Sequence, residues 1–554
     1  MKEFSDKLRS FIKYSCFALL SVFLALSILG AFIYKAEFCM FAYGDTSVLL
    51  PQNPIYLIAG ILISILFYKI LFALTQSRKN FELFKNGWPL ILIGACLQIS
   101  VILFFRIKLT ADWEVLDNIA KGILKGNLTS LEKGGYLYAY PHNLGITLYF
   151  ALLHKLIPAN IFFPRFLNVI YSLITIIVLN KTFTLLSPKY NKYTKQFFII
   201  TFFFLPPIFM SNLSYNEVFS TMLYLVGIYL SVKFTSDRKT GLLMGIVLAF
   251  SLAHFIRSIG FLFAVATFAY FFLMKINIKK IVLFTVLIII GFNLPLFIIN
   301  RQLYSKGLIS EPLGKNSIPI SKWLHMGLNE KYFGYWDQGE SYWIYPRDAK
   351  WNKKEADYLY RQGIKNKISE YGWLETANIY FKKVVWLWTE GTYQSVYLGM
   401  SHSSPGGYME ETPVSIYFEE NIKRRDLFKI PMYFLNITSL FTIMAFMIYA
   451  THRKLWKSVN KEMILFLLLL TFICFYLLWE VKPRYIYPVY PYNLFYLFDV
   501  AQHFSLHVFL VDTYPPGDFV AIYPTMGGPT YGDCLPNQDA GGPGDPVVVI
   551  VHHV

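Results

Sequence analysis

The feature that most constrains this chain is a series of apolar segments long enough to cross a lipid bilayer. A helix needs roughly 20 apolar residues to span the hydrocarbon core, and the segments 11–33, 54–75 and 280–299 reach that length with few charges. Backbone groups find no water inside lipid, so such segments fold as helices. The sequence therefore predicts an all-α polytopic membrane protein.

Composition agrees with this class. Of the 554 residues, 55% are hydrophobic and only 15% are charged, which lies well outside the usage of soluble domains. The length criterion predicts about 12 spans, at residues 11–33, 54–75, 88–106, 161–184, 197–213, 218–235, 241–256, 259–275, 280–299, 430–450, 462–479 and 485–503.

The net charge of +17 follows from membrane topology, and we expect no nucleic-acid partner. If the N-terminus is cytoplasmic, the basic loops all lie inside, and the short outer loops are nearly free of Lys and Arg. This agreement holds only if residues 142–158 do not cross the membrane. We therefore expect 142–158 and 114–126 to form two helices that lie on the outer membrane surface.

The predicted spans divide the chain into five segments. The segment 301–428 contains seven of the eleven Trp residues, and we expect it to form a small extracytoplasmic cap. No Lys or Arg follows Arg484, and the tail is rich in Pro and Gly, so we expect the tail to be disordered. The segments are two N-terminal spans (1–87), a transmembrane module with the outer loop 107–160 (88–300), the cap (301–428), the C-terminal spans (429–503) and the tail (504–554).

Two acidic residues are candidates for chemistry at the outer surface. Asp112 follows a span at the start of the first long outer loop, where a carboxylate can act as a general base. Its structural alternative is to cap the helix that follows, because Asp is a preferred N-cap residue. Glu217 is expected in the next outer loop, where an ionisable group is costly unless it is solvated or used. A solvated turn or a helix-capping glutamate is the structural alternative for Glu217.

Three arginines, Arg257, Arg301 and Arg484, are expected near the same surface. A guanidinium can hold a phosphate with two hydrogen bonds, so their convergence would suit a lipid phosphate or diphosphate. Each arginine alone could instead be a membrane anchor whose charge reaches the interface. The sequence contains no Walker loop, dinucleotide fingerprint, HExxH or GxSxG motif, and the five cysteines show no metal-binding spacing.

The order of these features resembles the GT-C superfamily of polyprenyl-phosphate-dependent glycosyltransferases. The nearest branches are the bacterial relatives of protein O-mannosyltransferases and of the lipid A aminoarabinose transferases. The similarity covers residues 88–492 and is carried by ADW (111–113), YPHNLG (140–145), KWLHMGLNEKYFGYWDQGE (322–340) and EVKPRYIYPVYP (480–491). The chain departs from the family in two ways: Asp112-Trp113 replaces the common Asp-Glu pair, and two extra spans precede the module.

The resemblance implies an inverting hexosyl- or pentosyltransferase of the cell membrane with its active site on the extracytoplasmic face. It implies that Asp112 is the catalytic base, that Glu217 is a second catalytic residue, and that Arg484 and Tyr485 contact the donor phosphate. Arg257 and Arg301 are further candidates for phosphate binding. The candidates for the acceptor or sugar pocket are Glu114, Tyr140, His142 and Asn143.

The partners implied by the resemblance are a polyprenyl-phosphate-linked sugar, membrane lipids, and a glycan, lipid or protein acceptor. No cofactor is required, and the sequence leaves open whether a divalent metal bridges Asp112 and the donor phosphate.

Two other functions stay open. A transporter or flippase of a lipid-linked sugar favours ionisable groups near the bilayer midplane and internal repeats. A non-catalytic accessory protein predicts that Asp112, Glu217 and Arg484 lie apart in the folded chain, whereas an enzyme requires them to converge.

Overall fold

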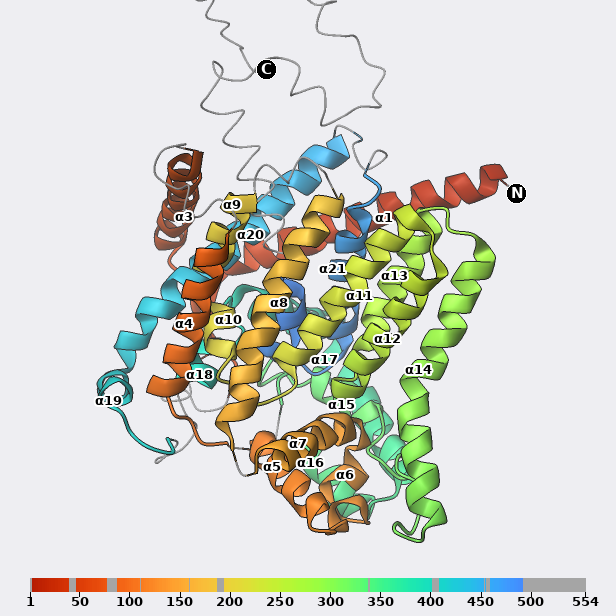
Figure 1. The fold of residues 1–554 in the computed structure, drawn as a ribbon. Helices are drawn as coiled ribbons and strands as arrows, with labels where there is room; N and C mark the ends of the chain where they lie inside the picture. The colour runs from red at the N-terminus through yellow and green to blue at the C-terminus, as the bar shows by residue number, and fades with distance from the viewer. Residues whose placement is uncertain are drawn as a thin grey trace, which may run out of the picture. The chain divides into compact units, whose positions relative to one another are not determined.

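The computed structural model describes residues 2–38, 46–76, 87–109, 111–158, 160–186, 194–336, 339–400, 408–452, 454 and 459–491. These residues belong to one compact unit within Met1–Phe509, which Figure 1 shows to be built from helices. The predicted tail, 504–554, and most of the predicted span 485–503 lie outside the described residues.

Apolar helices make up the body of the described chain. Six of them are long and apolar enough to cross a membrane, and four shorter helices are also apolar. The chain is therefore an all-α membrane protein, while the number of spans stays a prediction. The six longer helices are α1 (Lys2–Ile33), α3 (Pro54–Gln76), α8 (Phe162–Leu186), α11 (Glu217–Asp237), α14 (Ile278–Ser305) and α20 (Asp426–His452). The four shorter ones are α4 (Trp88–Phe104), α12 (Thr240–Ile256), α13 (Gly260–Leu273) and α21 (Met463–Leu478).

Two local features differ from the predicted pattern of spans. The segment 197–213 was predicted as one span but forms two helices, α9 (Thr194–Phe203) and α10 (Pro206–Met210). The break precedes Pro206 and Pro207, which cannot donate backbone hydrogen bonds to a continuous helix. The strands β1 (Tyr34–Glu37) and β2 (Val48–Pro51) form an antiparallel pair between α1 and α3.

The two predicted surface helices are confirmed as helices. They are α5 (Ala111–Leu124) and α7 (Leu144–Leu156), and they pack against each other at the lower end of the molecule in Figure 1. Asp117 of α5 and His154 of α7 are buried and lie 2.6 Å apart, from Oδ1 to Nε2. The short elements η2 (Thr129–Leu131), α6 (Tyr136–Ala139) and η3 (Pro141–Asn143) connect the two helices. We call the end of the molecule that carries α5, α6 and α7 the loop end.

The segment 301–428 is helical but is not a cap throughout its length. Its long helix α17 (Lys353–Thr389) is broken at Gly372. The part of α17 before the break packs on α15 (Ser321–Gly327), and α17 also contacts α1, α20 and α21. Residues 384–388 are all apolar and are buried. This part of the segment therefore belongs to the body and not to the cap. The remaining elements are α16 (Glu340–Trp343), η5 (Ile344–Asp348), α18 (Ser395–Met400), α19 (Pro413–Glu420), η6 (Ile422–Arg425) and η8 (Pro483–Val489).

Candidate functional site

A buried ion pair joins two of the predicted site residues. Arg484 Nη1 donates a hydrogen bond of 2.7 Å to Glu217 Oε1, and the Glu217 side chain is only 1% exposed. Glu217 is the first residue of α11, where the helix dipole favours a carboxylate. Arg484 lies in η8, a turn that contains Pro483 and Pro488. The pair therefore links the start of α11 to the segment that follows α21.

Arg257 lies beside this pair and contributes a second buried guanidinium. It follows the last residue of α12 and is 6% exposed. Its Nη2 lies 3.4 Å and 3.5 Å from the carbonyl oxygens of Arg484 and Tyr485. Within the described chain, its Nη1 is buried without a hydrogen-bond partner. Leaving a buried donor unpaired is costly, so the Arg257 nitrogen marks a place where an anion would be stabilised.

Aromatic rings surround the Arg484 guanidinium. The ring centroids of Tyr215, Tyr485 and Trp113 lie 5.3, 5.5 and 6.0 Å from its Cζ, within the range of cation–π contacts. Arg257 also lies over Tyr485, at 5.9 Å. Because Trp113 is the neighbour of Asp112 on α5, its contact with Arg484 brings the start of α5 to the ion pair.

Asp112 is an exposed carboxylate at the edge of this cluster. The helix α5 already includes Ala111, so Asp112 lies in its first turn rather than at the N-cap position that the structural alternative required. Burial raises the pKa of the Tyr136 phenol, and the nearby charge of Asp112 raises that pKa further. Because the Asp112 side chain is exposed, water can reach it. The Glu217 side chain, in contrast, is buried.

Two charged residues of the cluster were missed by the sequence reasoning. Lys322 of α15 is 2% exposed, and its Nζ donates a 2.9 Å hydrogen bond to Tyr140 Oη. Burial lowers the pKa of Lys322 to about 8, although Glu480 and Asp112 act in the opposite direction. Glu480 is buried, and burial raises the pKa of its carboxyl group. Both residues lie in segments that carry the GT-C resemblance, which is the signal that could have identified them.

An aromatic wall borders the cluster on the side of Tyr140. The His142 ring lies 5.9 Å from Tyr140 and 5.7 Å from Trp323. Trp323 in turn stacks on Trp479, with centroids 5.5 Å apart and an interplanar angle of 8°. Asn143 does not belong to this wall; its Nδ2 donates a 3.1 Å hydrogen bond to Tyr136 Oη.

Two predicted site residues are not brought to the cluster. Glu114 is exposed, and because it is two residues from Asp112 it points about 200° away around the helix. Arg301 is exposed near the end of α14 and has no contact with the cluster among the described residues. Within the same residues, no group of three His, Cys, Asp or Glu side chains lies close enough together to hold a metal ion.

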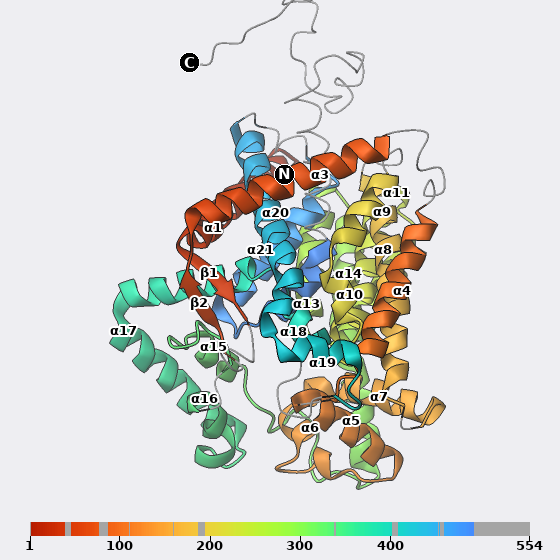
Figure 2. The same cartoon turned by 90° about the vertical axis from the view of Figure 1, so that its left-hand side faces the viewer.

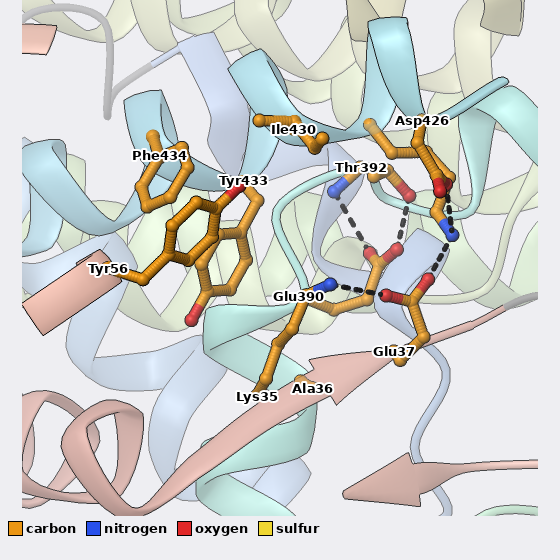
Figure 3. A pocket seen from close by; sticks show the side chains of 11 residues that line it. Lys35, Ala36, Glu37, Tyr56, Glu390, Thr392, Asp426, Ile430, Tyr433 and Phe434 are labelled. Carbon is orange, nitrogen blue, oxygen red and sulfur yellow. Dashed lines mark hydrogen bonds and ion pairs between the residues drawn. The ribbon is translucent and has the colours of Figure 1, made fainter. Parts of the chain in front are cut away.

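A separate charged pocket lies between β1, the end of α17 and the start of α20 (Figure 3). Glu37 pairs with Lys35 at 3.0 Å and also with Lys429. Glu390 accepts a 3.0 Å hydrogen bond from the backbone N–H of Thr392, and burial raises the pKa of Glu390 to about 7. These carboxylates are paired with groups of the protein itself. We therefore interpret the pocket as a structural contact that joins β1 to α17 and α20.

Comparison with protein-family models, curated proteins and solved structures finds no match to this chain. The resemblance to GT-C transferases therefore stays a prediction, as does the activity that it implies. The charged residues that the fold brings together are Asp112, Glu217, Arg257, Lys322 and Arg484.

Proposed function

We propose that this chain is a membrane glycosyltransferase that moves a sugar from a polyprenyl-phosphate carrier to an acceptor on the extracytoplasmic face. The observation that carries the proposal is that one exposed carboxylate, Asp112, lies near the buried guanidinium of Arg484, which has the second buried guanidinium, that of Arg257, beside it. Such a site offers a base and an anion-binding group side by side. A non-catalytic accessory protein gives no reason for this convergence.

The donor phosphate is the natural anion for the two arginines. Arg484 is already neutralised by Glu217, whereas Arg257 forms no ion pair with a described carboxylate and keeps an unpaired Nη1. A phosphate bound there would accept charge-assisted hydrogen bonds. The same cations would stabilise the negative charge that grows on the leaving phosphate as the glycosidic bond breaks.

Asp112 would accept the proton of the acceptor hydroxyl group. The acceptor oxygen attacks the anomeric carbon and forms the new bond, while the bond from that carbon to the phosphate oxygen breaks with its electron pair. Polyprenyl phosphate leaves, and the configuration at the anomeric carbon is inverted. If a divalent cation takes part, Asp112 is the side chain that would hold it, because hard cations prefer oxygen ligands, and the cation would supply further positive charge for the leaving phosphate.

Glu217 is better suited to positioning than to proton transfer. Its Oε1 is bonded to Arg484, and the side chain has almost no exposure. We therefore propose that Glu217 holds Arg484 in place. The aromatic wall, in which His142 is exposed and Trp323 and Trp479 are half-buried, would receive the apolar face of the sugar ring.

The transporter alternative places ionisable groups in the middle of spans. Here the charged groups lie at helix ends: Glu217 starts α11, Arg257 follows α12 and Arg484 follows α21. This arrangement favours chemistry at a membrane surface. A transporter would move the intact lipid-linked sugar and release no free polyprenyl phosphate.

The decisive assay offers the purified protein a panel of polyprenyl-phosphate sugars and measures free polyprenyl phosphate together with the glycosylated acceptor. Asp112→Asn should lower turnover by about 100- to 10,000-fold, the usual contribution of a general base. Glu114→Gln is the matched control, since this exposed residue on the same helix should keep normal turnover. Turnover by Asp112→Asn close to that of the unmodified protein would show that the base is wrongly assigned.

A further inference from the structure

An apolar patch lies where α17 bends. The break falls at Gly372, whose φ of +67° is a backbone conformation that favours glycine. Trp373 and Leu374 follow immediately and are 76% and 64% exposed. Ile368, one turn before the break, is also exposed, as is Ile320 beside α15. Single exposed apolar side chains are common, but a group of them on neighbouring elements indicates a binding surface. We call residues 364–374 the elbow.

The patch continues into a groove between α15 and the first part of α17. Ile320, Leu324, Ile364 and Ile368 line the groove together with two cations, Arg361 and Lys365. Arg361 Nε donates to Asp357 at 2.7 Å, so this cation is partly neutralised. Lys365 forms no ion pair with any of the described residues and is exposed. The groove thus combines aliphatic walls with an excess positive charge at its edge.

The elbow lies at the boundary between the apolar body and the polar cap. Beyond the elbow, Val385 packs against Gly30, close to the end of the membrane-length helix α1. Before the elbow, α17 packs on α15. Figure 2 shows α17 bending on the left of the molecule, beside β1 and β2. The exposed Trp373 and Leu374 therefore lie where the surface passes from membrane helices to the cap.

We propose that the elbow anchors the cap in the membrane surface and that the groove binds an anionic phospholipid. Trp is enriched at the interface between lipid and water, and an amphipathic helix with basic residues binds anionic membranes through apolar and electrostatic contacts. The position at the boundary and the excess positive charge favour lipid over a second copy of this chain or a soluble partner. This inference does not depend on the proposed transferase activity.

The anchor would also position the candidate site. The helix α15 contributes Leu324 to the groove and carries Lys322, which is buried in the site and bonded to Tyr140. Lipid in the groove would restrain α15 and with it the Lys322 ammonium.

Contact with lipid is tested by fluorescence in nanodiscs of phosphatidylcholine and phosphatidylglycerol whose acyl chains carry bromine near the headgroup. Bromine quenches tryptophans that touch the lipid. Trp373→Phe should reduce the quenched share of the emission, whereas Trp343→Phe, a control at another exposed cap tryptophan, should leave it unchanged. An unchanged quenched share in Trp373→Phe would overturn the membrane anchor.

Lipid charge is tested by native mass spectrometry of the full chain with phosphatidylglycerol or phosphatidylcholine. Arg361→Gln combined with Lys365→Gln should weaken retention of phosphatidylglycerol by at least about 5-fold, since one basic residue near an anionic surface contributes roughly that factor. Retention of phosphatidylcholine should not change. The matched control is Lys350→Gln combined with Lys354→Gln, two exposed lysines outside the groove. Equal effects of the two pairs, or no effect of the first pair, would overturn the lipid site.

Discussion

Replacing Glu217 by glutamine removes the negative partner of a guanidinium that has almost no access to water. In the folded chain, Arg484 Nη1 lies 2.7 Å from Glu217 Oε1, and the two side chains are 9% and 1% exposed. Removing one member of such a pair leaves a buried charge without compensation. Half-broken buried pairs cost roughly 3–5 kcal/mol. We expect about 3 kcal/mol for Glu217→Gln, at the lower end of that range, because the amide oxygen can still accept the Arg484 hydrogen bond.

The free energy of unfolding can be measured by titration with sodium dodecyl sulfate in mixed micelles, followed by circular dichroism. Combining Glu217→Gln with Arg484→Gln should cost less than the sum of the two single changes, by about 2 kcal/mol, as expected for residues in direct contact. A loss below about 1 kcal/mol for Glu217→Gln, or additive single effects, would refute the view that this pair is buried and coupled.

The same variant separates two roles for Glu217. If Glu217 only positions Arg484, the variant should retain most of its transferase turnover and bind polyprenyl phosphate at least as tightly, because a carboxylate that competes with the phosphate has gone. If Glu217 is instead a base, as the family resemblance implies, turnover should fall by about 100- to 10,000-fold, as expected for Asp112→Asn.

Three further predictions follow from buried charges. The pKa of Lys322 is lowered to about 8, so its positive charge is lost from the candidate site as pH rises through about 8. Binding of the anionic donor should therefore weaken over that range. Lys322→Arg should retain donor binding to higher pH, as measured by binding titrations over a pH series. Burial raises the pKa of Glu390 from 4.5 to about 7, so the contribution of its protonated carboxyl group to folding stability is complete below pH 4.5 and is lost as pH rises through 7. Glu390→Gln should therefore stabilise the fold by up to about 3 kcal/mol above pH 7 and be nearly neutral at low pH, as measured by thermal unfolding. Arg257→Gln should weaken binding of polyprenyl phosphate by about 10- to 100-fold, the value of a hydrogen bond to a charged group, whereas the exposed Arg301→Gln should not change it in the same titration.

Much of the helical framework could be predicted from the sequence because it depends on local properties. Apolar length identified helices such as α1, α8 and α14, and the requirement that 142–158 stay outside the membrane led to the prediction of two further helices, which are found as α5 and α7. The same reasoning failed where backbone chemistry interrupts a hydrophobic pattern: Pro206 divides a predicted span. The apolar end of α17 lies in the body although its segment was expected to be a cap.

The composition of the candidate site was only partly accessible from the sequence. Asp112, Arg257 and Arg484 could be proposed because each is a charged residue at the end of an apolar segment. Lys322 was missed because hydropathy does not distinguish a lysine buried against Tyr140 from a solvated one, and the resemblance of its segment to GT-C transferases was the one signal that pointed to it. Arg301 was expected in the cluster because its position after a span resembles that of Arg257, but the structure leaves it exposed near the end of α14, without a contact to the cluster among the described residues.

The sequence alone thus determined that the chain is a helical membrane protein, and it determined which charged residues end its helices, because hydrophobic length and helix boundaries are local properties. Only the tertiary structure decided that Glu217 is bound to Arg484, that Asp112 stays open to water, and that Lys322 joins them from a segment more than a hundred residues beyond Glu217. Such pairings depend on how every helix packs against the others, so they arise from the assembled fold and not from any single stretch of chain.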